Sequence, residues 1–118
     1  MHTRYKDITA YETKDGSLIR ELIHPAQHNN HHQSLAEAIV HPGQTTALHK
    51  HHKTEEVYFI RQGQGIMTLG QKQFSVQSGD SIVILPDTPH CINNNGSQDL
   101  QILCSCAPAY SHDDTELL

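Results

Sequence analysis

Apolar and polar residues alternate over short segments of this chain, and no segment repeats its apolar residues at the spacing of an amphipathic helix. Stretches rich in Gly, Pro, Asn and Asp separate these segments. Gly70-Gln71, between two of them, matches a two-residue hairpin turn with glycine first. The segments with strand character are 18–22, 34–40, 56–60, 65–69, 72–76, 81–85, 90–94 and 100–106. Many short strands at such spacing predict an all-β fold, an antiparallel sandwich or barrel.

The length of 118 residues suits one domain with one core. We expect residues 1–33 to form an N-terminal arm that packs on the barrel and residues 34–106 to form the barrel. Residues 107–118 are expected to be a C-terminal tail or a flap that closes over a pocket. The run from Val57 to Ile60 is apolar on both faces, so the outer face of that strand should be covered by the arm or by a second subunit.

Composition limits the partners. A net charge of -5 with no basic stripe argues against nucleic-acid binding. The first twenty residues lack the apolar segment of a secretory signal, and no apolar run approaches the roughly 18 residues needed to span a bilayer. We therefore expect a cytoplasmic protein without membrane contact.

Cys104 and Cys106 fall on one face of a strand and are expected to be buried thiols, not a disulfide.

Histidine is the compositional outlier, with 11 in the chain. The octet HKHHKTEE spans residues 49–56, and in a strand alternate side chains share a face. His49 and His51 therefore point the same way, and His90 and Glu56 reach the same cavity if their strands line it. Three imidazoles and one carboxylate can hold a divalent first-row metal and leave coordination sites free. The histidines of 24–32 sit in a polar loop and are expected to be solvated.

Two stretches resemble the conserved motifs of the cupins. PGQTTALHKHHKTEEVYFIRQG is similar to Gly-x5-His-x-His-x3,4-Glu-x6-Gly, and the count to the last glycine selects Glu56 over Glu55. GDSIVILPDTPHCINN is similar to the second motif, although Leu85 replaces its proline and Asp87 its glycine. Asp tolerates a left-handed conformation well, so we expect the corner to survive. The matching positions are Gly43, His49, His51, Glu56, Gly63, Gly79, His90 and Asn94.

The resemblance implies a double-stranded β-helix, or jelly-roll barrel, with an N-terminal arm and a short C-terminal tail. It also implies one divalent transition metal per chain, held by His49, His51, Glu56 and His90. The mixed nitrogen and oxygen ligands favour Mn or Fe, with Ni, Zn or Cu possible. Together with the apolar run on both faces of 57–60, the resemblance predicts a homodimer.

Such a metal favours ligands that bind through two oxygens. We expect a metal-dependent enzyme (a dioxygenase, decarboxylase, isomerase or lyase) acting on a small organic acid, sugar derivative or catechol-like compound. The alternative is a non-catalytic module that binds a sugar or an organic acid. Tyr58 and Arg20 are candidate catalytic residues, although Tyr58 also suits a barrel lining and Arg20 a surface ion pair. Only one of Arg20 and Glu21 can point inward. Cys104 is a candidate lining residue, and Tyr110, His112 and Asp113 are candidates from a flap.

Overall fold

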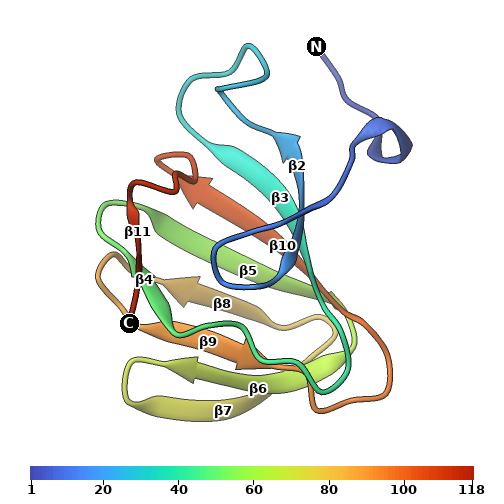
Figure 1. Ribbon diagram of the computed structural model, residues 1–118, viewed down its shortest axis with the longest axis vertical. Helices are drawn as coiled ribbons and strands as arrows, with labels where there is room; N and C mark the ends of the chain where they lie inside the picture. Colours follow the sequence, from blue (N-terminus) through green and yellow to red (C-terminus); the bar gives the residue numbers. More distant parts are fainter.

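The computed structural model describes residues 1–118, and it confirms the all-β prediction. Two antiparallel sheets pack face to face, with strands crossing from one to the other as in a jelly-roll barrel (Figure 1). One sheet has six strands in the order β1-β2-β3-β10-β5-β8, and the other has five in the order β11-β4-β9-β6-β7. No helix here has the length and apolar character needed to cross a membrane.

Each expected strand segment overlaps an observed strand, although the segments 81–85 and 90–94 each run one residue past the strand end. Gly70 takes a φ of 61° in the hairpin between β6 and β7, as predicted. The short strands β1 and β11 were not expected. The elements are η1 (Tyr5–Asp7), β1 (Tyr11–Glu12), β2 (Leu18–Ile23), β3 (Ser34–Val40), β4 (His49–His51), β5 (Glu55–Gln62), β6 (Gln64–Leu69), β7 (Lys72–Gln77), β8 (Ser81–Ile84), β9 (His90–Asn93), β10 (Leu100–Ala107) and β11 (Thr115–Leu117).

The core lies between the sheets because alternate side chains of each strand face inward. In β10, the buried residues alternate with half-buried ones along the strand. Ile60, Met67, Leu100 and Ile102 are at most 1% exposed. Each such side chain contributes about 1.5–3 kcal/mol on burial, so this apolar layer gives the barrel its stability. The histidines of β4 and β9 stand beside this layer rather than at the surface.

The N-terminal arm joins the barrel rather than lying loosely on it. Its strand β2 pairs antiparallel with β3 and extends the six-stranded sheet. On the outer face, Tyr5 donates a hydrogen bond of 2.6 Å to Glu37, and Arg20 contacts the same carboxylate at 3.3 Å. The arm therefore covers the outer face near Glu37. Phe59 and Val83, on β5 and β8 of the same sheet, stay 41% and 54% exposed.

The C-terminal segment also belongs to the barrel. Strand β11 pairs with β4, and Thr115 lies opposite His51 in the register. Figure 1 shows the C-terminal segment running alongside β4 at the edge of the five-stranded sheet. The end of the chain is therefore tied to the five-stranded sheet through β11.

Candidate metal centre

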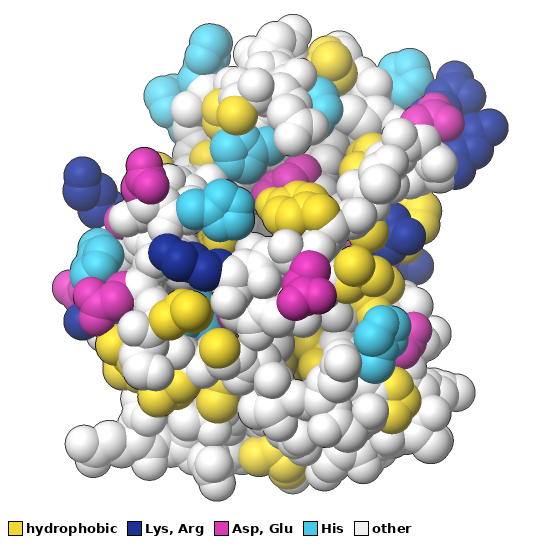
Figure 2. All heavy atoms as spheres, in the orientation of Figure 1, with side chains coloured by type: hydrophobic (Ala, Val, Ile, Leu, Met, Phe, Trp, Pro, Cys, Tyr) yellow, Lys and Arg dark blue, Asp and Glu magenta, His cyan; other side chains and the backbone are white.

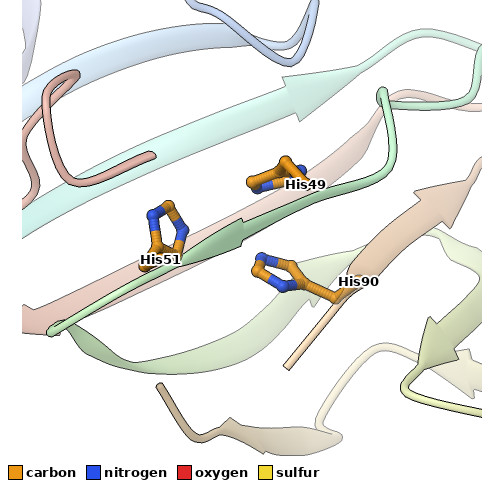
Figure 3. A group of neighbouring side chains, drawn as sticks. All are labelled: His49, His51 and His90. Carbon is orange, nitrogen blue, oxygen red and sulfur yellow. The ribbon is translucent and has the colours of Figure 1, made fainter. Parts of the chain in front are cut away.

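Three histidines from two neighbouring strands meet at one point inside the barrel. His49 and His51 belong to β4 and His90 to β9, and His49 lies directly opposite His90 in the strand register. Their side chains point toward one another (Figure 3). One ring nitrogen from each lies within 4.8 Å of the others, and all three residues are buried. Metals sit about 2.0–2.2 Å from such ligands, so this group could hold one ion.

The local chain path explains the convergence. In β4, Lys50 points away from the centre between the two histidines, as strand alternation requires. Before β9, Asp87 adopts a φ of 63° and its backbone N–H donates to the carbonyl of His51 over 2.7 Å. The left-handed corner expected at Asp87 is confirmed. It ties the loop that precedes His90 to the strand that carries His51.

Hydrogen bonds at the far ring nitrogen orient each imidazole. Nδ1 of His49 lies 2.7 Å from the Ala47 carbonyl, and Nδ1 of His90 lies 2.9 Å from the Thr88 carbonyl. A carbonyl oxygen only accepts, so Nδ1 carries the hydrogen in both rings. In the neutral ring Nε2 then keeps its lone pair. Burial and, next, the nearby His90 lower the pKa of His49, which favours that neutral form.

His51 reaches the same tautomer through a side chain. Its Nδ1 lies 2.9 Å from Oγ1 of Thr115, whose only hydrogen is donated to the carbonyl of Ser111 over 2.8 Å. The hydroxyl must therefore accept from Nδ1 of His51. In all three rings the lone pair of Nε2 is thus free to coordinate a cation.

Glu56 adds a carboxylate to the group. Its Oε1 lies 3.3 Å from Nε2 of His51 and 3.6 Å from Nε2 of His90. Burial raises the pKa of Glu56, but protonated imidazoles at His51 and His90 would outweigh burial and lower the pKa to about 2. Oε1 of Glu56 and Nε2 of His90 are buried without any hydrogen-bond partner. Two acceptors left bare beside each other are what a shared cation would satisfy.

The neighbouring polar residues of the octet face outward. Glu55 and His52 are both exposed. His52 contacts Asp87 and Glu116 at 3.3 Å, on the outer side of β4. The structure thus places Glu56, and not Glu55, beside the histidines, in agreement with the count to Gly63.

A cavity of about 40 Å³ opens beside the histidines. Tyr58, Cys104 and Cys106 line it together with Glu56. Burial, followed by the charge of Glu56, raises the pKa of the Tyr58 phenol and of both thiols, so all three groups stay protonated. Cys106 donates its S–H to Oε2 of Glu56 over 3.3 Å and so holds the carboxylate. Neither cysteine forms a disulfide, as expected.

Arg20, a candidate from the sequence, does not line this cavity. Strand alternation turns it to the outer face of β2, where it pairs with Glu37 and stacks on Tyr5 at 4.8 Å from the ring centre. Its neighbour Glu21 takes the inward position instead. Arg20 therefore makes the ion pair that the sequence offered as its alternative role, because strand alternation turns only one of these two adjacent residues inward.

Sequence reasoning missed Asp15 and the part played by Thr115. Oδ2 of Asp15 lies 3.7 Å from Nε2 of His49, although the stretch KDGS reads only as a turn. Tyr110, which was a flap candidate, does line the cavity. No local signal marks Asp15, because its approach to His49 depends on how the β1–β2 turn packs against the segment before β4. The histidines of the 24–32 loop do not line the cavity, as expected.

The model of the cupin domain matches residues 36–106 of this chain. The chain belongs to the cupin family. This cupin is 54% identical over 116 residues to the protein MJ1618 of Methanocaldococcus jannaschii, a match that covers 98% of this chain and 93% of the relative. It is 34% identical over 62 residues to an oxalate-binding protein of Thermotoga maritima, covering 52% of this chain and 51% of that protein.

A solved structure extends the comparison. The crystal structure of a predicted oxalate decarboxylase from Thermotoga maritima superposes with a TM-score of 0.80 at 25% identity, over 92% of this cupin and 99% of that chain. The likeness therefore extends beyond residues 36–106, which match the family model.

Proposed function

We propose that this cupin is a metal-dependent enzyme that acts on a small oxygenated metabolite bound through two oxygens. His49, His51, His90 and Glu56 would hold one divalent ion, Mn or Fe by preference, since the donors are three nitrogens and a carboxylate oxygen. The observation that carries the proposal is the pair of buried, unpartnered atoms, Oε1 of Glu56 and Nε2 of His90, beside one another.

The residues of the chain have separable roles in this proposal. The bound ion would supply Lewis acidity toward a carbonyl or carboxylate oxygen. Thr115 and the carbonyls of Ala47 and Thr88 hold the three rings in the tautomer that leaves Nε2 free. Tyr58 remains a phenol and offers a hydrogen-bond donor to a bound oxygen. The apolar walls around these groups exclude water and strengthen each polar contact.

A non-catalytic binding module is the second candidate. The Thermotoga maritima relative that matches half of this chain is an oxalate-binding protein. Tyr58, Cys104 and Cys106 all stay protonated, so none of them is a ready nucleophile or base. These two observations support a ligand that is held without being converted.

We also propose a cytoplasmic homodimer. The outer face of β5 and β8 presents Phe59 and Val83 to solvent. Leu35, on β3 of the same sheet, is 38% exposed, and Leu85, directly after β8, is 56% exposed. Large apolar side chains gathered on one sheet face are typical of an interface. The N-terminal arm covers only the region of Glu37, so a second subunit is the remaining cover.

Metal analysis tests the site. The protein, purified without a histidine tag and reconstituted with Mn²⁺ or Fe²⁺, should bind about one ion per chain. Glu56→Gln keeps the shape but removes the charge and should weaken binding by more than about 10-fold. The matched control Glu55→Gln removes an exposed charge one residue away and should leave the affinity unchanged. Equal affinities for the two variants would overturn the assignment of Glu56.

Turnover separates the two candidates. Oxygen-uptake measurements and product screens with organic acids, sugars and catechols would be run on the metal-loaded protein, with Glu56→Gln as the blank. Turnover that disappears in Glu56→Gln supports the enzyme. Stoichiometric metal with ligand binding but without turnover of any compound would leave the binding module as the function.

A further inference from the structure

The cavity beside the histidines has three acidic side chains in its lining and no Lys or Arg. Asp15, Glu21 and Glu56 all line it, whereas no Lys or Arg does. On the face shown in Figure 2, histidine, acidic and apolar side chains meet around a hollow in the upper half of the molecule. A divalent ion together with three carboxylates would leave about one negative charge in the cavity.

Glu21 is a buried acid of the cavity that is not among the proposed metal ligands. It is only 7% exposed, and it faces inward from β2. Its Oε1 accepts a hydrogen bond of 2.9 Å from the hydroxyl of Tyr11. Its Oε2 is buried and has no partner. A buried, unpaired carboxylate oxygen is costly, so it indicates that something outside the chain donates a hydrogen bond to it.

Tyr11 fixes the orientation of this carboxylate. Burial, and next the charge of Glu21, raises the pKa of Tyr11, so the phenol stays protonated and donates. Only Oε2 of Glu21 is then left for a ligand. Glu21 and Tyr110 also line an outer pocket of about 480 Å³, so Glu21 stands where the inner cavity meets the outer one.

Small side chains leave the space between Glu21 and the histidines open. Across the six-stranded sheet, Glu21 pairs with Ala36, Ala36 with Cys104, and Cys104 with Tyr58. All four line the cavity. One cavity therefore runs from Glu56 past Cys104 and Ala36 to Glu21.

We propose that this cavity selects a neutral hydroxy-carbonyl compound, of the class of hydroxyketones and sugars, over dicarboxylates. This inference rests on the proposed metal site. The carbonyl and an adjacent hydroxyl of the ligand face the metal ligands, and a further hydroxyl donates to Oε2 of Glu21. A dicarboxylate brings two more negative charges into a cavity that offers no cation besides the metal, and it has no hydrogen to give to Glu21.

Calorimetry with Mn²⁺-loaded protein tests the selection. The probes are dihydroxyacetone, which carries a carbonyl between two hydroxyls, and oxalate. The affinity of the protein for each probe is divided by the affinity of aqueous Mn²⁺ for the same probe. This ratio corrects for the different strengths with which the two probes chelate Mn²⁺. The protein should bind dihydroxyacetone at least 10-fold more tightly than aqueous Mn²⁺ does, and oxalate at least 10-fold more weakly.

Glu21→Gln should remove this preference. The Tyr11 hydroxyl donates to the amide oxygen, so the amide NH₂ faces the cavity and replaces an acceptor with a donor. Dihydroxyacetone should bind about 10-fold more weakly than to the wild type, and oxalate about 10-fold more tightly. Glu12→Gln is the control, because it removes an exposed acid of the same arm and should change neither affinity.

The outcomes are distinguishable. A wild-type protein that fails to bind Mn²⁺ overturns the proposed function before any probe is added. A protein that binds Mn²⁺ but holds oxalate at least as well as aqueous Mn²⁺ does, or fails to bind dihydroxyacetone, overturns the inference alone. Those wild-type ratios decide the matter even where Glu21→Gln does not fold. A folded Glu21→Gln with unchanged affinities also overturns it.

Discussion

At the scale of single residues, the candidate metal centre depends on hydrogen bonds made away from it. The hydroxyl of Thr115 uses its only hydrogen on the carbonyl of Ser111 and so accepts from His51. Backbone carbonyls do the same for His49 and His90. His51 is thus the one ring whose tautomer is set by a side chain, and a single substitution can test it.

Replacing Thr115 with Val keeps the shape and removes the acceptor for Nδ1 of His51. Partners of this kind typically contribute 10–100-fold in metal affinity, so we expect Thr115→Val to weaken Mn²⁺ binding by about that factor. Thr115→Ser retains the hydroxyl and should bind within a few-fold of the wild type. Affinities measured by competition with a chelator check this, and equal binding by Val and Ser variants would refute the role given to Thr115.

At the scale of elements, glycines with positive φ make two of the tight turns between strands of the barrel. Gly63 is the single residue between β5 and β6, with a φ of 90°. A Cβ at this position would lie 2.9 Å from the backbone oxygen of Asp99. Gly79 has a similar φ of 96°, but a Cβ there would meet nothing within 4 Å. An added side chain would therefore meet the same backbone strain at both positions, but it would be crowded by neighbouring atoms only at Gly63.

Gly79→Ala should lower the free energy of unfolding by about 1–2 kcal/mol, because an L side chain is strained at positive φ. Gly63→Ala should lose a further 1–3 kcal/mol or so, because the backbone of Asp99 must move. Urea unfolding followed by far-UV circular dichroism measures both. The expectation is contradicted if the two variants lose the same stability.

At the scale of the whole molecule, the outer face of the six-stranded sheet is where a second copy is expected to bind. Phe59 is 41% exposed, although the strand that carries it is apolar on both sides. A strand of an isolated barrel exposes polar residues on its outer face, so an apolar outer face indicates cover.

Phe59→Glu should convert the dimer to a monomer, because it places a charge in an apolar interface. Leu117→Glu is the control, since Leu117 is 47% exposed but lies on β11 in the other sheet. Light scattering coupled to size exclusion measures the mass at micromolar concentration. A monomeric wild-type protein would contradict the proposed homodimer. A Phe59→Glu variant that is still a dimer would show that the interface lies on another surface.

Short-range patterns were enough to predict much of this molecule. Alternating apolar residues and turn residues predicted the all-β fold, because a strand has a period of two that the sequence shows directly. The same period separated His49 and His51 from Lys50, and the count to Gly63 selected Glu56. The structure places these side chains together as expected. These positions were predictable because their spacing along the chain is tied to their place in a strand.

The contacts that required folding join residues far apart along the chain. Asp15 approaches His49, Thr115 binds Nδ1 of His51, and Glu21 faces the cavity while Arg20 turns away. The alternation of β2 shows that one of the last two faces inward, but not which one, because that depends on the register of β2 against β3. The candidate metal ligands could thus be read from the sequence, whereas two of the acids that line the cavity, Asp15 and Glu21, reach it only through the packing of the N-terminal arm.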